Sequence, residues 1–237
     1  MSRIDGRSLN QLRTVTVKKN YLKHADGSCL IQFGDTHVIC TAMIEESVPL
    51  FLKGTGKGWV TAEYGMLPGS CAQRIKRNQT SGRVYEIQRL IGRSLRSVVE
   101  MERLGERTVK IDCDVIQADG GTRTASITGG FIALALAFKK MKAQQKISDI
   151  PLKDSVAAVS AGICQGKVVP DLNYAEDSSA EVDMNVVMTG KGRIVEIQGT
   201  AEGEPFSKTQ MDKMFACAQK GIQALTVIQR RHLKGVL

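Results

Sequence analysis

Acidic residues gather in one stretch of the chain with a spacing that suits phosphodiester chemistry. Glu181 and Asp183 stand two residues apart in a segment typical of a strand, so their side chains project to one face, and Asp177 lies in the turn before it. A turn aspartate more often bonds to nearby backbone than to a substrate. Together with Asp183, however, Asp177 could hold Mg²⁺ or protonate a leaving oxygen. Asp177 and Asp183 are therefore the candidate catalytic and metal-binding residues.

Two glycine-containing segments are candidates for binding phosphate. Residues 120–123, Gly-Gly-Thr-Arg, separate a segment typical of a strand from one typical of a helix, a geometry that leaves backbone N–H groups free for an anion. Gly82 and Arg83 stand in the same way at the start of another helix. Neither segment has the Gly-Lys-Ser/Thr of a P-loop, and many Gly-Gly pairs are simple turns. Arg83 and Arg123 could nevertheless clamp one tetrahedral anion from both sides.

The periodicity of apolar residues predicts the elements that position these side chains in the first half of the chain. Strands are predicted at 28–33, 36–45, 59–64 and 107–117, the first two joined as a hairpin by Gly34 and Asp35. An amphipathic helix with a basic outer side is predicted at 83–103. A second helix, 125–142, is apolar around nearly its whole circumference, so it should be buried on most sides.

The second half of the chain has the pattern of an antiparallel sheet followed by one helix. Strands are predicted at 156–164, 168–172, 180–189 and 193–201. The helix should begin after Ser207, because Ser207 and Gln210 fit a capping box. The polar stretch 142–151 links the halves. We predict an α+β protein of two similar units, residues 1–145 and 152–237.

The charge of the chain favours a polyanionic partner. The 33 Lys and Arg residues outnumber the 24 Asp and Glu residues, which gives a net charge of +9, and 42% hydrophobic residues exclude a disordered or collagen-like protein. Residues 74–96 carry seven basic residues and one acidic residue, whereas 171–204 carry eight acidic and two basic ones. A protein that only binds a phosphate polymer gains nothing from nearby carboxylates, but catalysis on a phosphodiester needs them.

Other chemistries and locations are less consistent with the sequence. The six cysteines are scattered with no C-x-x-C pair, so we expect thiols in the core of a cytoplasmic protein and not a zinc site. The three histidines are too isolated to suggest catalysis. No stretch approaches the length of about 20 apolar residues that a spanning helix needs, and the first residues lack the apolar core of a signal peptide. We therefore expect a soluble protein with no membrane partner.

Several long blocks of the chain resemble the bacterial ribonuclease PH family. The resemblance runs from end to end and keeps the order of the family's motifs. It is carried by the residues 5–7, 58–68, 81–96, 104–130, 176–187 and 196–207. Related exosome subunits share weaker versions of these blocks.

This resemblance implies an enzyme that cleaves RNA with inorganic phosphate. The expected activity is a phosphate-dependent 3′–5′ exoribonuclease, or tRNA nucleotidyltransferase, that trims tRNA precursors and other structured RNA and releases nucleoside 5′-diphosphates. The reverse reaction adds nucleotides. The family's phosphate-binding positions match Arg83, Gly121, Thr122 and Arg123. Its catalytic aspartates match Asp177 and Asp183, with Mg²⁺ as cofactor, and which aspartate is the acid and which the metal ligand is left open.

The resemblance also implies a fold, an assembly and contacts with RNA. The fold is a pair of βαβα units like domain 2 of ribosomal protein S5, and the assembly is a hexameric ring, a trimer of dimers, with RNA reaching the sites from the central opening. The basic residues around the first phosphate segment are the candidate RNA contacts. They are Arg74, Lys76, Arg77, Arg89, Arg93 and Arg96.

One departure from the family and two alternative functions stay open at this point. The basic loop at 69–80 is shorter than the family's, which predicts weaker binding of tRNA. A non-catalytic RNA-binding ring subunit is the first alternative, but such subunits typically lose phosphate or acid positions that are all present here. A ribosome-associated structural protein, the second, rests on the S5-like fold alone.

Overall fold

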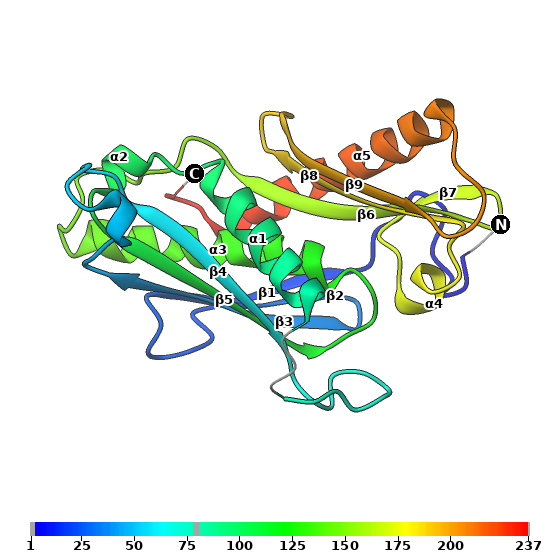
Figure 1. Ribbon diagram of the computed structural model, residues 1–237, viewed down its shortest axis with the longest axis horizontal. Coiled ribbons are helices and arrows are strands. Elements are labelled where there is room, and N and C mark those ends of the chain that lie inside the picture. Colours follow the sequence, from blue (N-terminus) through cyan, green and yellow to red (C-terminus); the bar gives the residue numbers. More distant parts are fainter. Residues whose placement is uncertain (1–2, 78–80, 237) are drawn as a thin grey trace.

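The computed structural model describes residues 3–77 and 81–236, which form two β-sheets with helices packed against them (Figure 1). The first sheet has the order β1-β2-β3-β5-β4, and its neighbours are antiparallel except for β4 and β5, which are parallel. Its strands are β1 (Val15–Lys19), β2 (Gly27–Phe33), β3 (Thr36–Glu45), β4 (Trp59–Met66) and β5 (Thr108–Gln117). The helices α1 (Gly82–Arg96) and α3 (Thr122–Ala143) pack against this sheet and against each other. Two short turns of helix, η1 (Leu50–Leu52) and α2 (Met101–Leu104), lie in its connections.

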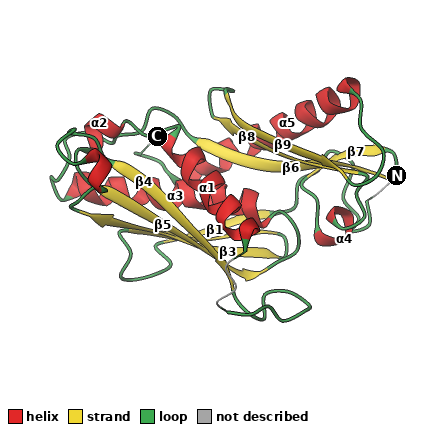
Figure 2. Ribbon diagram, in the orientation of Figure 1, coloured by secondary structure: helices red, strands yellow, loops and turns green. Residues whose placement is uncertain are grey.

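The second sheet is antiparallel throughout and has the order β7-β6-β8-β9. Its strands are β6 (Val156–Cys164), β7 (Lys167–Pro170), β8 (Val182–Thr189) and β9 (Ile194–Ala201). The long helix α5 (Lys208–His232) packs on it, and the short helix α4 (Tyr174–Asp177) connects β7 to β8 (Figure 2). The capping box of Ser207 and Gln210 is present at the start of α5.

Helix α3 packs against both sheets and so connects the two halves of the protein. It contacts β2, β3 and β5 of the first sheet and β6 of the second, and most of its residues are buried. At the junction, the side-chain Nε2 of Gln229 in α5 donates to the carbonyl oxygens of Thr128 in α3, at 3.2 Å, and Val156 in β6, at 2.9 Å. One continuous hydrophobic core therefore contains residues of both sheets and of α1, α3 and α5.

The structure confirms the predicted α+β class with two sheets and corrects several boundaries. Helix α1 ends at Arg96 and not at residue 103, because Val99 pairs with Leu152 in an isolated β-bridge and a new helical turn starts at Met101. Strand β1 was not predicted, since an edge strand with only half-buried apolar residues has weak alternation. Helix α4 was missed because four residues are too few for a periodic signal. The division into domains 1–145 and 152–237 stays a prediction.

Two further expectations concern the cysteines and the membrane. All six cysteines are free thiols, but only Cys29, Cys40 and Cys113 are buried in the core, whereas Cys71, Cys164 and Cys217 are half-buried. Within the described ranges, no helix combines the length and the apolar character that crossing a membrane requires.

Candidate active site

The two candidate catalytic aspartates come from neighbouring elements of the second half. Asp177 is the last residue of α4, whose start is fixed by a reciprocal capping box between Asn173 and Glu176. Asp183 is the second residue of β8, opposite Gly162 on β6 and Thr200 on β9. Asp177 and Asp183 are both half-buried. Glu181 lies outside β8, is exposed and accepts a bond of 2.8 Å from the N–H of Gly166 in a turn.

The electrostatics of these carboxylates bring the predicted residues into one site. Burial raises the pKa of Asp177, and the positive charges of Arg83 and Arg123 oppose that rise. Burial and then the charge of Asp177 raise the pKa of Asp183, whereas Arg123 and Arg83 lower it. Charges shift a pKa mainly over short distances. Arg83 and Arg123 are therefore near enough to affect the pKa of both aspartates, although the four residues come from four different elements.

The predicted phosphate segment is shaped by two glycines and by the start of α3. Gly120 and Gly121 have φ angles of +72° and +65°, in the left-handed region that favours glycine. A Cβ at Gly120 would lie 2.6 Å from the carbonyl oxygen of Leu172, so the segment packs directly against the residues that precede α4, the helix that ends with Asp177. Gly121 is the N-cap of α3 and has no side chain to occupy the N–H groups of the first turn. Those N–H groups and the positive end of the helix dipole form a suitable anion site.

Arg123 is oriented by side chains from both halves of the protein. Its Nη1 donates to Oε1 of Gln198 at 2.9 Å and lies 3.3 Å from Oε1 of Glu86. The Nε2 of Gln198 in turn donates to Oε1 of Glu86 at 2.9 Å and to Oε1 of Glu196 at 3.2 Å. Because the amide accepts from an arginine and donates to two carboxylates, only one orientation of the Gln198 side chain satisfies all of its bonds.

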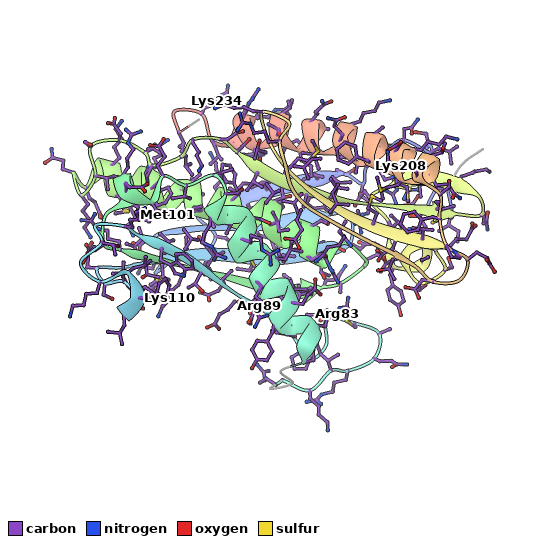
Figure 3. The ribbon with its side chains drawn as sticks, turned by 45° about the horizontal axis from the view of Figure 1, so that its top comes forward. Arg83, Arg89, Met101, Lys110, Lys208 and Lys234 are labelled. Carbon is purple, nitrogen blue, oxygen red and sulfur yellow. The ribbon has the colours of Figure 1, made fainter. Side chains whose placement is uncertain are left out.

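Arg83 lies at the exposed start of α1 (Figure 3). The side chain of Ser81, the N-cap residue of α1, accepts a bond of 3.4 Å from the N–H of Val84. This cap fixes the start of the helix next to Arg83. Thr122 is held from the other side, because its Oγ1 shares a hydrogen bond of 2.8 Å with the hydroxyl of the buried Tyr64. Tyr64, the partner of Thr122, lines the same hollow as Arg83.

The sequence matches two family models that together cover most of the chain. Residues 11–140 match domain 1 of the 3′ exoribonuclease family, and residues 154–221 match its domain 2. The chain belongs to this 3′ exoribonuclease family, the ribonuclease PH family. It is 57% identical over 240 residues to Ribonuclease PH of Bacillus cereus, an alignment that covers 99% of this chain and 98% of that relative.

Two solved structures share the fold of this ribonuclease PH family member at low identity. Rice (Oryza sativa) Rrp46 superposes with a TM-score of 0.81 at 21% identity and covers 98% of this chain and 100% of its own. A chain of the Archaeoglobus fulgidus exosome with RNA bound to the active site superposes with a TM-score of 0.80 at 20% identity, over 94% and 91% of the two chains.

Family membership confirms the enzyme class that the sequence predicts. The chain is a phosphorolytic 3′–5′ exoribonuclease, a nucleotidyltransferase of the ribonuclease PH family. The non-catalytic ring subunit is less well supported, because the chain is 57% identical to Ribonuclease PH of Bacillus cereus over nearly its full length.

The ribonuclease PH family member also contains three buried arginines beside the candidate site, Arg3, Arg7 and Arg13, that the residue patterns did not indicate. The guanidinium of Arg13 donates to Asp171 at 2.6 Å and to the carbonyl oxygen of Asp119. Arg13 therefore connects the start of the phosphate segment to the loop between β7 and α4. Arg3 and Arg7 bind Glu176 of α4, and the Nε of Arg3 donates to Oε1 of Glu176 at 2.7 Å. Among the blocks that resemble the family, only residues 5–7 include one of these arginines, Arg7.

The candidate RNA contacts are in different environments. Lys76, Arg77 and Arg83 line a hollow of about 460 Å³ between α1 and β4, and Arg74 and Arg89 are exposed. The Nη1 of Arg93 binds Glu196 at 2.9 Å. Arg96 is half-buried, lies 4.5 Å above the ring of Trp59 and donates to the carbonyl oxygen of Val60 at 2.8 Å. Arg96 therefore stabilises the packing of α1 on β4, and RNA binding by all these residues stays a prediction.

The carboxylates also determine which metal the site could hold. Among residues 3–77 and 81–236, no three His, Cys, Asp or Glu residues are grouped to bind a metal ion. Asp177 and Asp183 form a pair, and Mg²⁺ is commonly held by one or two carboxylates together with waters and substrate phosphates. Burial and then repulsion by the charge of Asp177 raise the pKa of Asp183, and a bound cation would offset that repulsion. The pair fits Mg²⁺ and does not fit a closed zinc site.

Proposed function

We propose that this enzyme shortens RNA from its 3′ end at the site formed by Arg83, Arg123, Asp177 and Asp183. One observation carries the proposal. The charges of Arg83 and Arg123 act on the pKa of both Asp177 and Asp183, although the four residues come from α1, α3, α4 and β8. Cations next to carboxylates are what an attack by phosphate on a phosphodiester requires, since one anion must approach another and a leaving oxygen must be protonated.

Arg83, Arg123 and the first turn of α3 hold inorganic phosphate. Gly121 and Thr122 bring the backbone N–H groups close to it, and the arginines neutralise charge that would repel the RNA. A phosphate oxygen attacks the phosphorus of the last 3′–5′ linkage and forms the new P–O bond, while the bond to the 3′ oxygen breaks. The last nucleotide leaves as a nucleoside 5′-diphosphate, and the shortened RNA takes up a proton and ends in a 3′ hydroxyl.

Asp177 and Asp183 act at the departing 3′ oxygen. Burial raises the pKa of Asp177 and of Asp183, which makes each a better proton donor near neutral pH than an ordinary carboxyl group. The aspartate that is ionised would help to hold Mg²⁺, which when bound would stabilise negative charge on the phosphate oxygens. The reverse reaction at this site adds nucleotides from nucleoside diphosphates.

The substrate, assembly and location follow the family. We infer that the enzyme trims tRNA precursors and other structured RNA in the cytoplasm, with Arg74, Lys76, Arg77, Arg89 and Arg93 along the RNA path. The fold shared with an exosome chain supports assembly into a ring, which we infer to be a hexamer built as a trimer of dimers. Residues 75–77 of the basic loop line the hollow beside Arg83, and residues 78–80 of the loop lie outside the described residues.

Product analysis tests the proposed reaction directly. A 3′-extended tRNA is incubated with the enzyme and Mg²⁺, with or without inorganic phosphate, and the released nucleotides are separated. Nucleoside 5′-diphosphates should form only when phosphate is present. Equal degradation without phosphate, or release of monophosphates, would show hydrolysis and contradict the proposal.

A further inference from the structure

A second group of basic side chains gathers at the end of α3 that is remote from the active site. Three segments far apart in the sequence meet there. The Nζ of Lys19 donates to the carbonyl oxygen of His232 at 2.9 Å, and the Nζ of Lys139 donates to the carbonyl oxygen of Lys234 at 3.5 Å. Lys140 pairs with Asp26 at 2.8 Å. We call this region the distal basic surface, and its cations are Lys19, Lys23, Lys139, Lys140, Arg231 and Lys234.

The distal basic surface is exposed and hollowed. All six cations are exposed to solvent. Lys19, Lys23, Lys139 and Lys140 line a hollow of about 430 Å³ between β1, β2 and the end of α3. Arg231 is exposed and directly precedes His232, whose carbonyl oxygen accepts the bond from Lys19. Asp26 is the only carboxylate among the described residues that line this hollow.

The need to stabilise helix ends does not account for so many cations. Helices α3 and α5 both end here, and each helix C-terminus carries roughly half a negative charge. Those two ends and Asp26 together offset about two of the six cations. An excess of about four positive charges remains on one exposed, concave surface, and such an excess attracts a polyanion.

The distance from the active site shows which part of an RNA this surface could contact. Lys139 follows Arg123 by 16 residues on the same straight helix, so the two lie about 24 Å apart at 1.5 Å per residue. In Figure 3, Lys234 and Arg83 lie on opposite sides of the molecule. At roughly 3.4 Å per stacked nucleotide, about seven nucleotides separate the two positions. Only an RNA longer than this can occupy both.

We propose that the distal basic surface binds the phosphate backbone of the RNA body while the 3′ end occupies the active site. This inference rests on the proposed function and extends it to a second contact with the same substrate. The cations contact phosphates and not bases, so the surface increases affinity for long RNA without selecting a sequence. It leaves the phosphate site and the chemical step unchanged.

A triple variant and a charge-matched control test this proposal. Lys19→Gln, Lys139→Gln and Arg231→Gln are combined in the test variant. The control combines Lys53→Gln, Lys208→Gln and Lys213→Gln, which removes the same charge from exposed positions elsewhere. Binding of a 40-nucleotide RNA and of a tetranucleotide is measured without phosphate by fluorescence anisotropy at several salt concentrations, and gel filtration checks that both variants keep the native assembly.

The proposal predicts a different effect of the test variant on the binding of the long RNA and of the tetranucleotide. The test variant should bind the long RNA roughly tenfold more weakly than the control, with a salt dependence reduced by about two in the log–log slope, and it should bind the tetranucleotide equally well. Equal binding of the long RNA by both variants overturns the proposal. Loss of binding to vesicles of anionic phospholipid with RNA affinity unchanged also overturns it and indicates a membrane partner. Phosphorolysis of the tetranucleotide by the unmodified enzyme tests the proposed function separately.

Discussion

The Nη1 of Arg123 donates to Oε1 of Gln198 across 2.9 Å, although 75 residues separate them in the chain. This bond joins α3 of the first half to β9 of the second and fixes the plane of the guanidinium. Glu86 contacts both side chains, so the arginine is held by one neutral and one negative partner. The orientation of the phosphate-binding group in the proposed mechanism therefore depends on a residue from the other sheet.

Replacement of Gln198 should weaken phosphate binding selectively. Gln198→Leu removes the hydrogen bond to the charged Arg123, so we expect the KM for phosphate to rise about tenfold, equivalent to about 1.4 kcal/mol, with the KM for RNA nearly unchanged. Steady-state kinetics with each substrate varied in turn measure this. Gln223→Leu, at an exposed position of α5, is the control. A similar rise in both KM values would instead indicate a general disturbance of the fold.

Replacement of Arg123 should abolish phosphate-dependent turnover. Arg123→Ala removes a preorganised cation from the site, and loss of such a group typically reduces kcat by a factor of about 10² to 10³. Binding of RNA in the absence of phosphate should change little, because many other basic groups contribute to it. Turnover and anisotropy measurements on the same preparation check the two parts. Retained turnover at saturating phosphate would exclude the assigned role.

Replacement of Asp183 should stabilise the protein near neutral pH while it inactivates the enzyme. The pKa of Asp183 is raised in the folded state by burial and by Asp177, so the ionised carboxylate favours unfolding once the pH exceeds the folded pKa. Asp183→Asn removes that charge. The Tm should therefore increase at pH 7, and the gain should disappear as the pH falls below the ordinary aspartate pKa. Thermal unfolding across this range measures it, and a lower Tm at pH 7 would contradict the prediction.

Replacement of Arg13 should destabilise the fold strongly. Arg13 is buried and bonded to the buried Asp171, and Arg13→Ala would leave that carboxylate without its main partner. Breaking a buried pair in this way costs about 3–5 kcal/mol in the free energy of unfolding. Urea denaturation measures the loss. Lys208→Ala, which breaks an exposed pair with Asp212, should change the stability by less than about 0.5 kcal/mol. Similar losses for both variants would contradict this account.

The short basic loop at 69–80 should reduce the affinity for tRNA. Compared with a family member that has a longer basic loop, this enzyme has fewer residues available to contact the tRNA body, so we expect a higher Kd at matched salt. The KM for phosphate should be the same in both enzymes, since Arg83 and Arg123 are present. Filter binding with one tRNA precursor compares the two, and equal affinities would refute the prediction.

Local patterns in the sequence predicted most of the elements, and they also indicated the candidate site residues. The apolar circumference of α3 predicted its burial, and Ser207 with Gln210 predicted the start of α5. Gly121 before α3 and Asp183 on β8 were identified because a glycine at a helix start and a carboxylate on a strand have chemical meaning in their immediate neighbourhood. Such features depend on residues within a few positions of one another, and that spacing is given by the sequence alone.

The relations between the site residues were decided only by the tertiary structure. Arg13 and Asp171 are 158 residues apart, and no local pattern indicates that they form one buried ion pair. The same holds for Arg123 with Gln198 and for the three segments of the distal basic surface. The net charge of +9 predicted a polyanionic partner, but folding determined that basic residues collect at both ends of α3. Electrostatic and hydrogen-bond energies depend on distance in space, and packing of the two sheets around α3 sets those distances.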